Sequence, residues 1–132
     1  MAVELTPFVS LAMANATTLY TTGDAVGAKA SFPNLPERGT IMSVVVVDLD
    51  SEHVNLDVVL FNKDIAGVAD NAAFDPTDAE LSTCVGAILV STWKVFADNA
   101  LAVADNVGLP YWAPSNTLYF QCVTRGAPTY AA

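Results

Sequence analysis

Acidic side chains gather in one stretch of the chain, residues 60–80, which reads "LFNKDIAGVADNAAFDPTDAE". Its carboxylates belong to Asp64, Asp70, Asp75, Asp78 and Glu80. A calcium loop needs oxygen ligands at alternate positions, a central glycine and a closing glutamate. Here the acidic residue after Asp64 lies six positions further on, and Gly67 does not fall where that loop needs it. We therefore predict no metal site and no other cofactor.

The end of this stretch, "DPTD", is typical of a helix start instead. Asp75 suits the N-cap, Pro76 the first helical position, and Asp78 the third, where its carboxylate faces the positive end of the helix dipole. Asp70 and Asn71 are turn formers. The pattern predicts one short helix near residues 76–83, and it indicates that the acidic run shapes the backbone.

Nucleophilic catalysis has little support, because the one histidine, His53, lies in a predicted hairpin turn and no GxSxG motif is present. The carboxylates of a glycosidase meet only in the fold, so spacing alone leaves such a pair open. Asp48, Asp50, Glu52 and Asp57, however, fall at predicted turn and solvent-facing positions. We predict that the protein is not an enzyme.

The composition predicts one domain with a real core, because 53% of the 132 residues are apolar. Charged residues make up only 14%, which suggests that a partner covers part of the surface. The net charge is −9, and the basic residues are scattered singly: Lys29, Arg38, Lys63, Lys94 and Arg125. Nucleic acid and anionic membranes are therefore poor partners.

Two uncharged windows, residues 5–23 and 106–124, contain proline with threonine or asparagine, so neither predicts a membrane span. The first residues carry Glu4 and no basic side chain, which argues against a secretory signal. Cys84 and Cys122 each lie in a strand-like run, and we expect buried free thiols in preference to a disulfide.

Apolar residues alternate along most of the chain, as in β-strands. In "VNLDVVLF", Val54, Leu56, Val58 and Leu60 share one face. We predict strands at residues 14–21, 25–32, 41–48, 54–61, 84–92, 100–104 and 117–124, with turns at 21–24, 32–39, 50–53 and 105–116. Such a series predicts an all-β protein: an antiparallel β-sandwich, jelly-roll-like.

The strand at residues 41–48 is apolar on both faces through "VVVV", although a lone sandwich normally hydrates one of them. We therefore predict a stable homo-oligomer, with a trimer preferred.

Aromatic residues are the other candidate contacts. Trp93 follows a strand, and we expect it in the core. Tyr111 and Trp112 lie between prolines, and core packing and an exposed anchor for a partner or a sugar are equally favoured there.

The two ends complete the predicted organisation: an N-terminal arm (1–14), a β-sandwich domain (15–125) and a C-terminal tail (126–132) that contains Tyr130. The arm carries Phe8, Val9, Leu11 and Met13 without a clear period over its whole length. Frayed ends are the ordinary interpretation. We favour an arm that buries these side chains on a neighbouring subunit or partner.

Four stretches carry a family resemblance: "TTLYTTGDAVGAKASFPN", "GTIMSVVVVDLDSEHVNLDVVLFN", "DNAAFDPTDAELSTCVG" and "LYFQCVTRGAPTY". Together they resemble small structural proteins from the head-gene region of tailed bacteriophages, some of which are decoration or cement proteins on the capsid exterior. The resemblance implies a β-sandwich, a symmetric oligomer and no enzymatic activity, and it assigns no functional residues.

The expected function is that of a virion structural protein, made in the host cytoplasm, which binds the major capsid protein from outside and stabilises the shell. The acidic charge agrees with a position away from packaged DNA. Two alternatives stay open: a phage tail or fibre accessory protein, and a carbohydrate-binding β-sandwich module that uses Tyr111 and Trp112 as a stacking platform.

Overall fold

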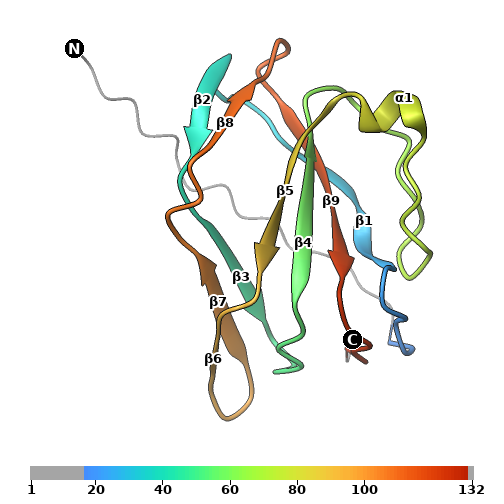
Figure 1. The fold of residues 1–132 in the computed structure, drawn as a ribbon. Coiled ribbons are helices and arrows are strands. Elements are labelled where there is room, and N and C mark those ends of the chain that lie inside the picture. Colours follow the sequence, from blue (N-terminus) through green and yellow to red (C-terminus); the bar gives the residue numbers. More distant parts are fainter. Residues whose placement is uncertain (1–16, 131–132) are drawn as a thin grey trace.

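Strand-forming, alternating sequence builds two layers of antiparallel sheet in the computed structural model, which describes residues 17–130 (Figure 1). The first layer is a four-stranded sheet with the order β1-β9-β4-β5. Its strands are β1 (Ala25–Phe32), β9 (Leu118–Thr124), β4 (Leu56–Phe61) and β5 (Cys84–Val90).

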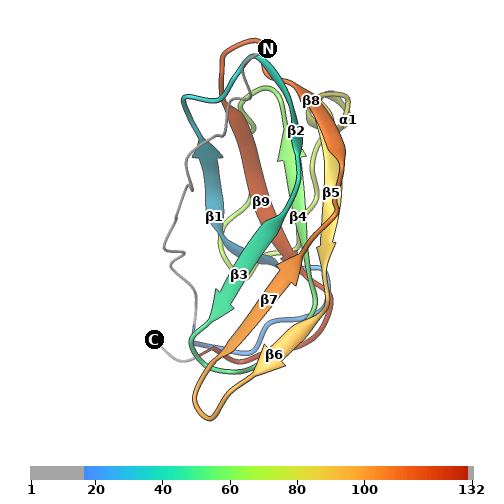
Figure 2. The same cartoon turned by 90° about the vertical axis from the view of Figure 1, so that its left-hand side faces the viewer.

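The second layer has two parts, which lie in front of the first layer in Figure 2. One part is a three-stranded sheet with the order β3-β7-β6, and the other is the ribbon β2–β8. Their strands are β3 (Val44–Asp48), β7 (Ala100–Ala104), β6 (Trp93–Val95), β2 (Arg38–Ile41) and β8 (Leu109–Trp112). The predicted all-β sandwich is confirmed.

The main core fills the space between the layers. Leu56, Val58 and Leu60 of β4 point into it, as the alternation predicts, together with Phe120 and Cys122 of β9. A second apolar cluster lies on the opposite side of the four-stranded sheet, where Val59, Phe61 and Val123 pack with Ile65. β4 is therefore buried on both faces.

The short helix α1 spans Asp78–Leu81, inside the predicted range. Its N-cap is Thr77, so the prediction of Asp75 as the cap is wrong. The Thr77 side chain accepts a hydrogen bond from the Glu80 N–H, and the Glu80 carboxylate accepts one from the Thr77 N–H. This reciprocal capping box satisfies two backbone donors, whereas a cap at Asp75 would offer one carboxylate.

Some strand bounds differ from the prediction for local reasons. The single strand expected at 41–48 is divided after Ile41 into β2 and β3, which pair with different partners. Residues 17–21 are not a strand, although Tyr20 is fully buried and its N–H bonds to the Pro128 carbonyl. The expected turn at 105–116 contains β8, in which Pro110 is tolerated because the ribbon has only two strands.

Candidate functional site

The acidic stretch is an architectural segment that fastens itself to β1. Asp64 forms an ion pair with Lys29 (2.9 Å), and the same ammonium donates to the Ile65 carbonyl. Asp70 accepts hydrogen bonds from the Tyr20 hydroxyl and the Gly27 N–H, each at 2.7 Å. These carboxylates hold the backbone, as the sequence predicts for the run as a whole.

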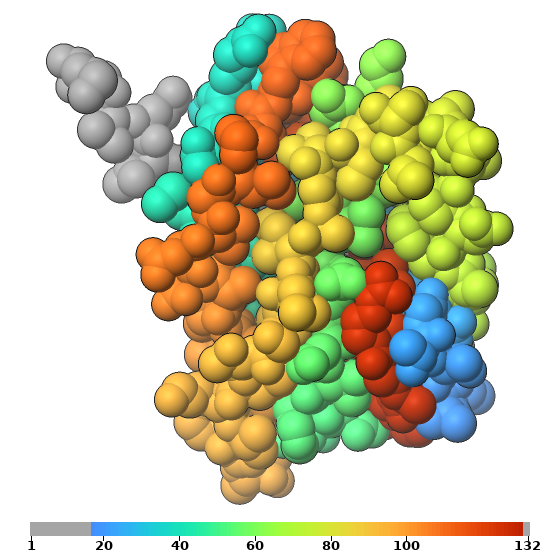
Figure 3. Space-filling view, viewed as in Figure 1, coloured from blue at the N-terminus to red at the C-terminus, as the bar shows by residue number. Residues whose placement is uncertain are grey.

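Gln121 of β9 holds the same segment against the four-stranded sheet. Its side chain is fully buried on the outer side of β9. The amide nitrogen donates to the carbonyls of Gly27 and Val68, and the amide oxygen accepts from the Val68 N–H. In Figure 3 the segment (light green to yellow) lies at the upper right, over this sheet. It covers Phe61 and its apolar neighbours.

Glu80 joins the ends of the segment, since it accepts hydrogen bonds from the backbone N–H groups of Thr77 and Ala66. These bonds hold the pKa of Glu80 below its ordinary value. The hydrogen bond from Lys29 lowers the pKa of Asp64 in the same way. Among residues 17–130, no group of three or more His, Cys, Asp or Glu side chains is placed to hold a metal ion.

The acidic residues of the β3–β4 turn also act on the backbone. Asp48 is buried and accepts from the N–H groups of Asp50 and His53. The His53 ring nitrogen Nδ1 lies 2.7 Å from the Ser51 carbonyl oxygen. Asp57 pairs with Arg125 across β4 and the end of β9. All of these roles are structural. The prediction of a turn or solvent-facing position is wrong for Asp48, which is buried because its carboxylate bonds to the backbone of the turn.

Both cysteines are free thiols, as expected, and they lie on opposite faces of the four-stranded sheet. Cys122 is buried as predicted, whereas Cys84 is only partly buried. Burial raises the pKa of Cys122 to about 12, so its thiol is protonated at neutral pH.

The neighbouring aromatics Tyr111 and Trp112 do not form one surface. They are successive residues of β8 and point to opposite faces. Tyr111 turns inward and packs over Gly39, where an added Cβ would lie 2.7 Å from the phenol oxygen. Trp112 faces outward at 47% exposure, with the Arg38 guanidinium 5.7 Å from its ring centroid and its Nε1 donating to Glu37. A two-ring sugar platform is therefore not assembled.

Two further aromatics pack against the core. Trp93 lies partly buried against it, as predicted. Tyr130 does so too, in edge contact with Tyr20 at 5.6 Å between ring centroids, and burial raises its pKa. The nearby Thr129 N–H donates to Glu52. The described part of the predicted C-terminal tail is thus attached to the sandwich.

The remaining predicted contact residues, Phe8, Val9, Leu11 and Met13, lie outside the described residues. No helix within residues 17–130 has the length and apolar character to span a bilayer.

An apolar surface lies on the outside of the three-stranded sheet, which faces the viewer in Figure 2. Val44, Val46, Ala102 and Ala104 point into the core, so the alternate residues point outward. We call the outward set the outer face: Val45, Val47, Leu101 and Val103, with Lys94 beside Leu101. Val47 is 60% exposed, Val45 41% and Val103 39%.

Other exposed apolar residues surround the outer face. Within residues 17–130, seven of the eleven large exposed hydrophobic side chains belong to β3, β6, β7 or the turns next to them, namely Met42, Val45, Val47, Leu49, Val95, Phe96 and Val103. Such a cluster marks an interaction surface. The run at 44–47, which is apolar on both faces, indicated this surface in the sequence. The residues that β7 and β6 add to it could not be predicted, because they depend on strand pairing.

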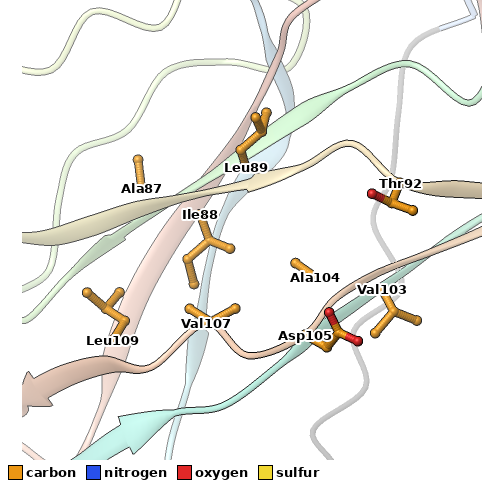
Figure 4. Close-up of a pocket in the computed structure, with 9 residues that line it drawn as sticks. All are labelled: Ala87, Ile88, Leu89, Thr92, Val103, Ala104, Asp105, Val107 and Leu109. Carbon is orange, nitrogen blue, oxygen red and sulfur yellow. The ribbon is translucent and has the colours of Figure 1, made fainter.

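A groove of about 410 Å³ runs along the free edge of β5 (Figure 4). Ile88 points across it toward Val107, and Leu109 closes one end by packing over Gly86. Its lining is Ala87, Ile88, Leu89, Thr92, Val103, Ala104, Asp105, Val107 and Leu109.

Comparisons of the chain with protein-family models, curated proteins and solved structures found no match. The fold and the surface together define a small all-β sandwich protein with an exposed apolar patch, Val45, Val47 and Val103, on the outside of one sheet.

Proposed function

We propose that this protein is a non-enzymatic structural protein of a bacteriophage head, which binds the outside of the capsid and stabilises it as a cement or decoration protein. The observation that carries the proposal is the outer face. Val45, Val47 and Val103 are exposed on a sheet whose other side is already packed against the core. Burying one such side chain is worth roughly 1.5–3 kcal/mol, so a few suffice for attachment.

The distribution of charge supports a protein partner over nucleic acid. The chain carries 14 acidic and 5 basic residues. Two of the basic residues, Lys29 and Arg125, are occupied in ion pairs with Asp64 and Asp57. A DNA-tracking surface needs clustered, available cations. The head-protein resemblance of the sequence selects the major capsid protein among possible protein partners.

Stabilisation would follow from mass action. A protein that binds only the assembled shell lowers the free energy of that state, and shell disassembly must first release it. A homo-oligomer, with a trimer preferred, would hold several capsid subunits at once and raise the effective affinity without any new kind of contact.

The test uses purified virions and empty expanded capsids of the phage that encodes the protein. Mass spectrometry of the virions should detect the chain, and the purified protein should cosediment with the capsids. Val45→Asp/Val47→Asp should weaken that binding at least about tenfold, because two carboxylates would be buried at the contact.

The matched control is Leu81→Asp, which changes an exposed apolar residue of α1, away from the outer face. It should bind as the unchanged protein does. Equal binding by the Val45→Asp/Val47→Asp variant would contradict the proposed attachment, and absence of the chain from virions would contradict the proposed function.

A further inference from the structure

The two edges of the four-stranded sheet differ in how their backbone groups are used. At the β1 edge, residues 71–74 run alongside the strand: Ala25 N–H donates to the Ala72 carbonyl, and Asn71 N–H donates to the Ala25 carbonyl. Gly27 sits in a bulge, where its N–H bonds to Asp70 and its carbonyl accepts from Gln121. At residues 25–27 this edge is therefore closed to further pairing.

At the β5 edge, by contrast, no other segment of the described chain pairs with the backbone. β5 is the last strand of the sheet, and within residues 17–130 its backbone ladder is made with β4 alone. An edge strand directs alternate N–H and C=O groups away from its partner, and these can pair with an added strand. The groove lined by Ile88, Val107 and Leu109 runs directly beside this edge.

We infer that the β5 edge accepts residues 7–13 of a second copy of this chain as an added β-strand. The added strand would bond to the free groups of β5 and place alternate side chains in the groove, as in strand-addition complexes. Exchange of such strands between copies would produce the homo-oligomer.

The chemistry of residues 7–13, "PFVSLAM", fits this place. Val9, Leu11 and Met13 stand at alternate positions, so an extended chain directs all three to one side. The segment carries no charge, and the groove contains a single charged residue, Asp105. Pro7 stands at the start of the segment, where a strand tolerates the missing N–H.

The chain is too short for residues 7–13 to reach β5 of the same molecule, so the donor must be a second copy. Thr18 lies on the β1 side of the sheet, because its hydroxyl accepts from Asn71, whose N–H bonds to Ala25 of β1. A strand added beyond β5 lies four strand spacings from β1, or ~19 Å. Met13 lies five residues before Thr18, so the two can be at most ~18 Å apart. A chain with residues 7–13 on β5 therefore cannot be the chain that contains that β5.

The experiment is a complementation test by sedimentation velocity at micromolar concentration, without any capsid. One variant lacks residues 2–12, and so has the groove but no donor strand. The other is Val107→Asp, which keeps the donor strand and puts a carboxylate in the groove. Each alone should self-associate at least about tenfold more weakly than the full chain. Mixed, they should form a 1:1 complex.

Leu89→Asp serves as a second groove variant, since this residue lines the groove and is 53% exposed, so the fold tolerates the change. Leu19→Asp, on the β1 side, is the control and should associate normally. Association of the truncated chain equal to that of the full chain would overturn the inference. So would a mixture that forms no complex, or a truncated chain that fails to fold. Because no capsid is present, these outcomes are independent of the proposed function.

Discussion

Both layers of the sandwich carry apolar side chains on their outer sides, but only one of them is covered. On the four-stranded sheet, Val59, Phe61 and Val123 are packed under Ile65 and the rest of the acidic segment. On the three-stranded sheet, Val45 and Val47 are exposed to solvent together with Val103 of β7. Within residues 17–130, the chain supplies a cover for the first surface and none for the second.

The difference shows how the apolar content of this chain is divided between folding and binding. The covering segment is attached by the exposed ion pair Lys29–Asp64 and by Asp70, and beneath it by the buried amide of Gln121 and by apolar contacts. An interface between two proteins has the same plan, with an apolar core and a polar rim. We therefore regard the outer face as the half of such a contact whose other half belongs to a partner.

The largest loss of stability should come from removing a large buried side chain beneath the acidic segment. Phe61 is fully buried, and Phe61→Ala should lower the free energy of unfolding by about 3–5 kcal/mol through lost burial and a cavity. Phe96→Ala, on the open side at 59% exposure, should change it by less than about 0.5 kcal/mol. Denaturant unfolding of the two variants measures this contrast, and similar losses would remove the distinction between the two sides.

The next effect concerns the polar anchor of the cover. Gln121→Leu should cost about 1–3 kcal/mol, because the Val68 N–H and the carbonyls of Gly27 and Val68 would lose their partner. Hydrogen exchange should become faster in residues 64–74 before the rest of the sheet opens. Unchanged stability and exchange would mean that the apolar contacts alone hold the segment.

The cap of α1 gives a smaller and more specific effect. Thr77→Ala should cost about 1 kcal/mol, since it removes the side-chain half of the capping box. Asp75→Ala should stay within about 0.5 kcal/mol of the unchanged protein, because Asp75 is not the N-cap. Thermal unfolding measures both losses. A larger loss for Asp75→Ala than for Thr77→Ala would show that Asp75 is the cap after all.

The smallest effect is a pH dependence of the stability that the acidic segment contributes. The pKa values of Glu80 and Asp64 are lowered in the folded protein, so their contribution is present above the unfolded pKa and is lost as pH falls through the folded pKa. The melting temperature should fall below pH ~4, and it should fall less in Glu80→Gln. An equal fall in this variant would exclude Glu80 as a source of that dependence.

Local signals in the sequence were sufficient for much of the fold. The strands β1 and β7 occur at the predicted residues, because each lies between clear turn signals. The helix was found by its acidic and proline residues, but the cap was misplaced by two positions because Thr77 and Glu80 satisfy each other reciprocally. The ribbon β2–β8 was missed, since a proline-containing segment becomes a strand only through its long-range partner.

The candidate surface shows the same limit. The apolar run of β3 predicted a strand with two apolar faces. That Val45 and Val47 lie beside Val103 and Leu101 depends on the register between β3 and β7, which no local pattern contains. Conversely, Gln121 alternates with Phe120 and Cys122 along β9, a pattern typical of an outward polar residue, and only the segment folded over it makes it fully buried. Residues whose environment is set by distant parts of the chain were therefore the ones that the sequence alone could not place.

The most direct test of the central claim is a cryo-electron microscopy map of the phage particle that carries this protein. We expect the outer face, with Val45, Val47, Leu101 and Val103, to be turned toward the shell and in contact with the capsid protein. The acidic segment over β9 should then be turned away from the shell. A map in which the outer face is exposed to solvent, while the particle is held through the acidic side, would contradict the claim.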